Sequence, residues 1–342
     1  MFIQKNGETI MRKFSIILLA CLMLLYGNLS VKAQGTTLKT IRVGVSWNEK
    51  MQSLVQAWQD YMQQYGEAFG KKWNVKFDWV INVANGDPVQ QAANIEDLIS
   101  KKVDVIVARA QDAAAIGSSI KAAQAAGIPF ITFDRQALGV APTSHVGADS
   151  LNQSISTGEA FAALLKQNNV QGKCIELMGA LVDQNAVFRS QGWKDVETRL
   201  GQWTTVVQVP TDWKADKFKS GTANALAAHP EANCMFVASD FAFSSVQSAL
   251  EDAGRWAPAG DPKHMWIADQ DLNPQGYQAM LGGYIDVATT YDAYFHAVEL
   301  VNVIARVATG DIVQPLYLVP GRVATPKTLP DMQYIWAKDY KD

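Results

Sequence analysis

The feature that most constrains the fold of this chain is a regular alternation between short apolar segments and longer segments with helical periodicity. Residues 41–46 form a short apolar run typical of a buried strand, and apolar side chains at three- and four-residue steps from 51 to 69 predict a helix after it. The pattern repeats about ten times, as far as residue 308. Strands that alternate with helices indicate βαβ units, which form parallel sheets. The predicted strands are 41–46, 75–81, 103–108, 128–133, 145–148, 174–178, 205–209, 234–238, 265–268 and 286–290.

The number of these units predicts more than one sheet. About ten strands exceed one ordinary sheet, and the alternation starts afresh near residue 170. We therefore expect an α/β protein with two lobes, each built on a doubly wound parallel sheet.

The N-terminal segment has the composition of a secretory signal peptide. Two basic residues precede an almost wholly apolar run from 14 to 26, which is too short to span a bilayer. Val31 and Ala33 stand at the two positions that a signal peptidase recognises, which places the cleavage after Ala33. We expect residues 1–33 to be a signal peptide, with translation starting at Met11 and the mature chain exported.

A lipid anchor is the less favoured interpretation of the same segment. Residues 18–21 resemble a lipobox, in which Cys21 would carry the lipid. The apolar run continues past Cys21 to Leu25, however, so cleavage there would leave an apolar stub on the mature protein.

Charge and motif content count against several classes of function. The formal net charge is −3 and no basic cluster occurs, so a nucleic-acid partner is not indicated. The sequence contains no Walker loop, G-x-G-x-x-G, G-x-S-x-G or H-E-x-x-H motif, and its four histidines are scattered. We therefore expect no enzyme activity, no cofactor and no metal site, and an exported enzyme is a minor alternative.

Two cysteines remain after the expected cleavage, Cys174 and Cys234, each at the start of an apolar run. Their spacing matches no metal-binding pattern. Two interpretations stay open: ordinary buried thiols, or a disulfide, which an oxidising compartment permits.

Polar and aromatic side chains collect where the predicted strands end, and ligands of open α/β sheets bind at the carboxyl ends of the strands. The set mixes carboxylates, amides, arginines and aromatics, which suits the hydroxyl groups and apolar ring faces of a sugar. Aspartate, asparagine and serine at these positions are also preferred helix N-caps, and capping alone is the favoured role of Asp112. The candidate ligand residues are Trp47, Asn48, Arg109, Asp134, Arg135, Asn185, Arg189, Trp213, Asp240, Asp271 and Tyr291.

Four segments, in this order and spacing, resemble a known family. They are GIPFITFDR at 127–135, RSQGW at 189–193, ASDF at 238–241, and DLNPQG at 271–276 with Gly283 ahead of a strand. Over about residues 41–336 the chain resembles periplasmic sugar-binding proteins of the ribose/galactose type, which are related to the ligand domains of lactose repressors. The resemblance implies the type I periplasmic binding fold, with two lobes joined by a three-strand hinge. The implied lobes are 38–141 plus 292–316, and 142–291 plus 317–342.

The resemblance also implies roles for single residues. Asp134 and Arg135 match the family's hydroxyl-binding pair, and Arg189 matches its cleft arginine. Asp271 matches an aspartate that precedes a turn, Trp213 matches an aromatic that stacks on the sugar, and Asn48 lies near a family asparagine. We expect the two aspartates and two arginines to hydrogen-bond hydroxyls while Trp213 and Trp47 cover apolar faces. The family topology also makes the strands of Cys174 and Cys234 neighbours, close enough to cross-link.

Some positions depart from the family pattern. Ser239 precedes Asp240 where asparagine is frequent, Arg109 stands where asparagine is common, and Tyr291 stands where glutamine is common. Residues 49–52 replace an Asn-Pro-Phe-Phe segment. These changes leave the expected fold intact and leave the identity of the sugar open.

The function implied by the resemblance is that of a non-enzymatic periplasmic receptor. It would bind a monosaccharide or related polyol between its lobes, deliver it to an inner-membrane ABC permease, and act as a monomer. The main alternative is a sensor that presents its ligand to a membrane kinase or chemoreceptor. A transcription regulator is disfavoured, because a helix-turn-helix should then replace the signal peptide.

Overall fold

The computed structural model describes residues 38–49 and 53–340. The expected signal peptide, its start at Met11 and the alternative lipid site at Cys21 lie outside these residues. Within the described part of the chain, no helix is long and apolar enough to cross a membrane.

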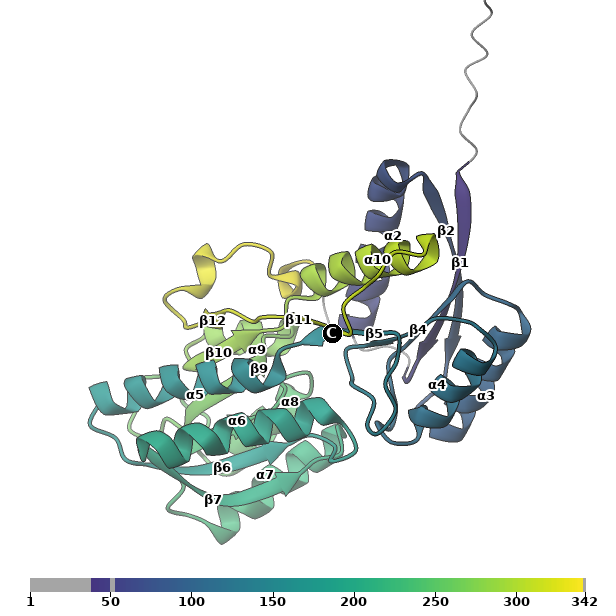
Figure 1. The fold of residues 1–342 in the computed structure, drawn as a ribbon. Helices are drawn as coiled ribbons and strands as arrows, with labels where there is room; N and C mark the ends of the chain where they lie inside the picture. The colour runs from purple at the N-terminus through teal and green to yellow at the C-terminus, as the bar shows by residue number, and fades with distance from the viewer. Residues whose placement is uncertain (1–37, 50–52, 341–342) are drawn as a thin grey trace, which may run out of the picture. The chain divides into compact units, whose positions relative to one another are not determined.

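The described chain forms two six-stranded sheets, one in each lobe (Figure 1). The strand order is β11-β5-β4-β3-β1-β2 in the first sheet and β12-β10-β9-β8-β6-β7 in the second. All neighbours are parallel except β10 and β12. The predicted α/β class with two mainly parallel sheets is thus confirmed. The strands are β1 (Lys39–Trp47), β2 (Val75–Val83), β3 (Val105–Ala108), β4 (Phe130–Phe133), β5 (Ser144–Ala148), β6 (Gly172–Met178), β7 (Trp203–Pro210), β8 (Cys234–Val237), β9 (Trp266–Asp271), β10 (Val287–Thr290), β11 (Leu316–Val319) and β12 (Val323–Ala324).

Helices cover both faces of each sheet. In the first lobe α2 and α10 share one apolar core with the sheet, and α3 and α4 share another on the opposite face. In the second lobe α5 and α6 cover one face, while α7, α8 and α9 cover the other. Every residue of β3, β4 and β8 is buried, which explains why these strands are continuous apolar runs. The helices are α2 (Ser53–Trp73), α3 (Pro88–Ser100), α4 (Ile116–Ala125), α5 (Ser150–Gln167), α6 (Gln184–Leu200), α7 (Ala215–Ala228), α8 (Phe243–Asp252), α9 (Pro274–Leu281) and α10 (Ala293–Thr309).

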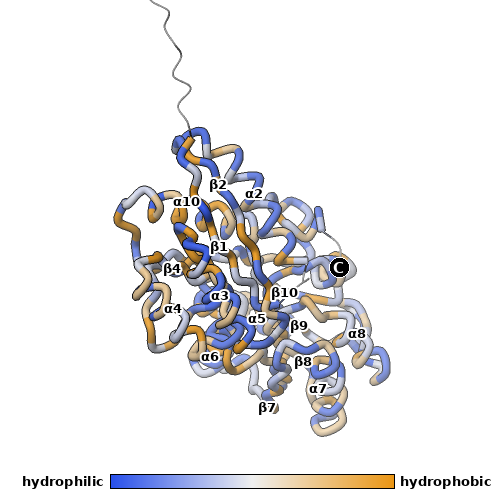
Figure 2. Tube along the Cα trace, turned by 90° about the vertical axis from the view of Figure 1, so that its right-hand side faces the viewer, coloured by the Kyte–Doolittle hydropathy of each residue, from blue (hydrophilic) through white to orange (hydrophobic). Residues whose placement is uncertain are grey.

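The helices are amphipathic in the way the sequence predicts. Along α2 the buried side chains recur at helical spacing and include Leu54, Trp58 and Met62. Figure 2 shows the corresponding change between blue and orange segments along the chain trace.

The chain crosses between the lobes three times, and two crossings come later than predicted. β5 pairs with β4 and β11 in the first sheet, so the chain leaves this lobe after Ala148, not after 141. β11 also belongs to the first sheet, so the last crossing follows Val319, not 316. The sequence shows that a segment is strand-like but not which sheet it joins, because the pairing of β5 with β4 and β11 is a long-range contact. The remaining crossing joins β10 to α10 at Tyr291.

The family resemblance places the C-terminal segment after β12 in the second lobe, but in the structure this segment contacts both lobes. Ile335 and Ala337 pack in the core of the second lobe, whereas Trp336 packs in the core of the first. Residues 325–340, which include the short 3₁₀ helices Leu329–Asp331 and Trp336–Lys338, therefore bridge the lobes.

The cysteine question is resolved in favour of a disulfide. Cys174 on β6 and Cys234 on β8 are direct partners in the parallel ladder, and their sulfurs are bonded. Both side chains are fully buried in the core between the second sheet and α5–α6.

Candidate functional site

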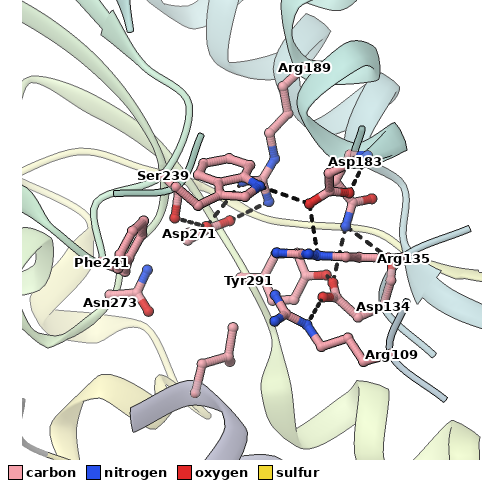
Figure 3. A pocket seen from close by; sticks show the side chains of 13 residues that line it. Arg109, Asp134, Arg135, Asp183, Arg189, Ser239, Phe241, Asp271, Asn273 and Tyr291 are labelled. Carbon is pink, nitrogen blue, oxygen red and sulfur yellow. Dashed lines mark hydrogen bonds and ion pairs between the residues drawn. The ribbon is translucent and has the colours of Figure 1, made fainter. Parts of the chain in front are cut away.

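A cavity of about 30 Å³ lies between the lobes, at the carboxyl ends of their strands. It has room for one or two water molecules. Both lobes and the β10–α10 crossing contribute to its wall (Figure 3). The lining residues are Leu54, Arg109, Asp134 and Arg135 from the first lobe, Tyr291 at the crossing, and Asp183, Asn185, Arg189, Trp213, Ser239, Phe241, Asp271 and Asn273 from the second lobe.

Asp134 is a buried carboxylate that groups from both lobes contact. It follows β4 directly and accepts hydrogen bonds from the Arg109 guanidinium and the Tyr291 hydroxyl. Asn185 from the other lobe donates its amide to the Asp134 carbonyl at 3.0 Å and to its carboxylate at 3.1 Å. Burial alone would raise the pKa of Asp134, but the charges of Arg109 and Arg135 outweigh it and lower the pKa to about 2. Asp134 is therefore a permanent acceptor at neutral pH.

A second ion pair joins the two lobes. The Arg135 Nε lies 2.8 Å from Oδ2 of Asp183, which belongs to the opposite lobe. The same oxygen accepts the Trp213 indole N–H at 3.0 Å. Trp213 lies against the backbone at Gly179, where a Cβ atom would stand 2.0 Å from the indole ring. Glycine at this position thus makes room for the aromatic wall of the cavity.

The third ion pair lies within the second lobe. Arg189 donates to both carboxylate oxygens of Asp271, at 2.6 and 3.1 Å, and the Ser239 hydroxyl donates to the same carboxylate at 2.5 Å. Burial raises the pKa of Asp271, although the Arg189 charge opposes this shift. The Arg189 guanidinium also lies over the Tyr291 ring, 5.5 Å from its centroid.

The backbone at this site adopts an uncommon conformation. Asp134, Trp213 and Asp271 have φ values of 63°, 56° and 93°. Residues other than glycine rarely occupy this left-handed region, and such strain concentrates at functional sites. All three residues line the cavity, so the strained positions coincide with the candidate site.

Most of the predicted ligand residues do line the cavity, but three do not. Trp47 is buried in the core of the first lobe, where its ring stacks on Trp58 at 6.2 Å between centroids. The expectation that Trp47 covers a ligand face is therefore wrong. Asn48 lies behind Arg109 and accepts its guanidinium N–H at 2.7 Å. Asp240 lies behind Asn273 and accepts its side-chain N–H at 2.6 Å.

Other cavity residues carried no predicted role. Asp183, Ser239 and Phe241 follow predicted strands and so had the right position. Leu54 fell on a predicted buried helix face, where a cavity residue has the same pattern as a core residue. Asn273 precedes Pro274 at the start of α9, and this Asn-Pro pair was the available signal. In the described residues no group of three histidine, cysteine or acidic side chains could hold a metal ion.

Residues 51–312 match the family model described as periplasmic binding protein domain. The chain is 25% identical over 243 residues to the ribose import binding protein RbsB of Salmonella typhimurium, which covers 71% of this chain and 78% of that protein.

Solved structures share the fold. An ABC transporter solute binding protein from Bacillus halodurans with bound myo-inositol superposes with a TM-score of 0.75 at 23% identity, covering 86% of this chain and 97% of the other. The fructose binding periplasmic domain of a hybrid two component system gives a TM-score of 0.76 at 20% identity, covering 86% and 93%.

Proposed function

Because this chain belongs to the periplasmic binding protein domain family, we propose that it is the receptor of an import system. It binds a monosaccharide or related polyol between its lobes and delivers it, as a monomer, to an inner-membrane ABC permease. The name of the Salmonella relative, a ribose import binding protein, supports this assignment.

The observation that carries the proposal is the charge balance of the cavity. Each of its arginines has its own carboxylate partner, so the wall offers directional donors and acceptors but no unpaired charge. An uncharged polyhydroxy ligand fits such a wall, whereas a sugar acid or phosphate needs a cation that is free to pair with it. The pairs are Arg109–Asp134, Arg135–Asp183 and Arg189–Asp271.

The apolar part of the wall suits a sugar ring. Trp213 and Phe241 lie in the second lobe with their ring centroids 6.2 Å apart, and Leu54 comes from the first lobe. These side chains can cover the C–H faces of a ring while the ion pairs bind its hydroxyls.

Binding requires the lobes to part. A cavity of about 30 Å³ is smaller than any monosaccharide. We infer that the ligand replaces direct contacts between the lobes, such as Asn185 with Asp134, and that closure over it follows a hinge motion.

A screen by thermal shift tests the ligand class. D-ribose, D-fructose, myo-inositol and glycerol form the panel, with a sugar acid and a sugar phosphate as charged comparators. Saturation at about 100 times Kd should stabilise the protein by roughly 2.7 kcal/mol. Binding of the charged compounds but not the neutral ones would contradict the proposal.

Substitutions then test the site. We expect Asp134→Ala and Arg189→Ala to weaken binding about 10- to 100-fold in calorimetry, because each removes a charged hydrogen bond. Arg199→Ala is the matched control, since Arg199 lies on the same helix α6 and pairs with Glu159 at the surface. Folded variants that bind like the parent would show that these residues do not hold the ligand.

Two parts of the proposal concern the cellular setting. We propose export through a signal peptide at 1–33, for which N-terminal sequencing of the exported protein should find Gln34 first.

A sensor is the second candidate function, because the fold also occurs as the periplasmic domain of a two component system. Loss of sugar uptake on deletion of the gene supports the importer, and loss of a transcriptional response alone supports the sensor.

A further inference from the structure

Asp240 lies directly behind the cavity wall, with no exposure to solvent. It follows β8, and its Oδ1 accepts two hydrogen bonds from Asn273, one from the backbone N–H at 2.9 Å and one from the side-chain amide at 2.6 Å. Two donors on one oxygen hold both the backbone and the side chain of Asn273.

Asn273 is the N-cap residue of α9, yet its side chain makes no capping hydrogen bond. The amide nitrogen is directed to Asp240 instead. The amide oxygen is thus left for the cavity, which Asn273 lines beside Phe241 (Figure 3). An asparagine held in this way offers a ligand hydroxyl a hydrogen-bond acceptor.

Asp240 shares its buried position with a second carboxyl group, that of Asp269 on β9. Oδ2 of Asp240 and both oxygens of Asp269 are buried without a hydrogen-bond donor in good geometry. Asp269 is the ladder partner of Val237 at the end of β8, three residues before Asp240, and the two carboxyl groups act on each other's pKa. Two adjacent buried carboxylates cannot both stay charged, so the pair retains a proton. Asp240 already accepts two N–H groups, which favours the proton on Asp269.

We propose that Asp240 is a positioning residue of the ligand site. It holds Asn273 so that the amide oxygen faces the ligand, and it does so as one member of a buried carboxyl pair that retains a proton. Gly276 on α9 is part of this arrangement, since a Cβ atom there would stand 1.5 Å from Oδ2 of Asp240. The inference rests on the proposed function, because it assigns a ligand hydroxyl to Asn273.

The charged surroundings agree with a retained proton. Burial and the nearby charge of Asp271 raise the pKa of Asp240 to about 8, and burial with the Asp240 charge raises the pKa of Asp269 well above its usual range. Asp271 is itself paired with Arg189 of α6. The neighbouring elements α9 and β10 carry no charged side chain, and α5 contacts β9 through Thr157.

The first test needs no ligand. The pair's own contribution to stability should fall as pH rises from about 4 to about 8, because the folded pair keeps a proton that the unfolded chain releases; this slope is measured as the difference between the parent and a variant, in which the contributions of His145 and His296 cancel. Asp269→Asn supplies a permanent donor and should flatten this slope, whereas Asp252→Asn at an exposed position of α8 should not. In NMR spectra, the Asn273 side-chain amide should stay protected in Asp269→Asn and lose protection in Asp240→Ala. An unprotected amide in the parent would overturn the proposal.

The second test is a double-mutant cycle measured with D-ribose and then with myo-inositol. Asp240→Ala and Asn273→Ala should each weaken binding about 10-fold, and the double variant should bind no more weakly than Asn273→Ala alone. Additive losses would mean that Asp240 does not act through Asn273. Asp240→Asn replaces the alanine variant if the latter does not fold. If neither compound binds the parent, the proposed function fails for these ligands, and the amide measurement still decides the role of Asp240.

Discussion

Asp183 connects three parts of the cavity through a single carboxylate. As the N-cap of α6 it accepts the backbone N–H of Asn185 at 3.0 Å. Its other oxygen accepts the Trp213 indole N–H and pairs with Arg135 of the opposite lobe. The buried Asp183 carboxylate thus links Trp213, in the wall of the second lobe, to Arg135 of the first lobe. The contact favours the closed arrangement of the lobes.

Asp183→Asn should therefore shift the protein towards an open form. Asparagine remains a good N-cap, but the variant leaves the buried Arg135 charge unpaired, which costs several kcal/mol unless the lobes part and water reaches it. We expect a larger radius of gyration in small-angle scattering of the ligand-free protein. Asp212→Asn is the control, since Asp212 pairs with Lys217 at the surface of the same lobe. Identical scattering from parent and Asp183→Asn would contradict the role of this pair.

The sequence predicted which single residues lie near the ligand site, but not which side chains they contact. The rule that ligands bind at strand carboxyl ends identified Asp134, Arg135, Arg189 and Asp271, all of which line the cavity. It could not tell that Trp47 turns into the core, because that direction is also set by packing against Phe133, which is distant in sequence. The same limit applies to every position whose role depends on a contact between lobes.

At the level of elements, the disulfide is the feature with the clearest consequence for stability. It links two neighbouring strands, β6 and β8, at positions 60 residues apart in the sequence. Trp193 and Phe236 of the same core stack with ring centroids 4.6 Å apart. The bond thus closes a long loop within a densely packed region.

Replacing both cysteines with alanine should lower the free energy of unfolding by about 2–4 kcal/mol, because the unfolded chain gains the freedom that the closed loop removes. Urea denaturation monitored by tryptophan fluorescence measures the effect. The parent protein reduced while unfolded serves as the comparison, and it should approach the variant. An unchanged midpoint in the variant would show that the bond contributes nothing to stability.

The elements themselves were the most predictable level of structure. The apolar runs and helical periodicities predict the strands β1 to β10 to within a few residues. The pattern is strongest for β3, β4 and β8, where burial on both faces leaves a continuous apolar run. β11 and β12 were not predicted. They are short, β11 is partly exposed, and they lie outside any strand–helix alternation. The two strands close the hinge, so missing them also moved the predicted lobe boundaries.

Across the whole molecule, the hinge joins distant parts of the chain. Arg322, just before β12, donates to both carboxylate oxygens of Asp292 at 3.0 and 2.7 Å, and also to the Gln333 carbonyl at 2.8 Å. Two of the three crossings and the C-terminal segment therefore meet at one ion pair. The sequence pattern predicts two lobes and the family resemblance implies three connections, but the contact between the connections depends on the assembled fold.

Two buried histidines in the first lobe, next to the cavity, should limit stability in acid. The ring centroids of His296 and Tyr291 are 4.6 Å apart. His145 Nδ1 forms a hydrogen bond with the Thr132 hydroxyl at 2.9 Å. Burial lowers the pKa of each to about 4, so both stay neutral in the folded protein at neutral pH. The nearby Asp134 charge favours protonation but does not outweigh burial. The folded state therefore favours the neutral form of both imidazole rings.

The sign of the pH effect follows from these pKa values. The unfolded chain binds a proton at each histidine below about pH 6.5, while the folded chain does not until about pH 4, so each histidine removes about 1.4 kcal/mol of stability per pH unit between those values. His296→Phe should remove one contribution. The urea midpoint of the variant minus that of the parent should be larger at pH 4.5 than at pH 7. The increase should correspond to roughly 2–3 kcal/mol. The Asp240–Asp269 pair has the opposite slope, but it is common to both proteins and cancels in the comparison. A difference between parent and variant that stays constant with pH would mean that His296 binds its proton as readily in the folded chain as in the unfolded one.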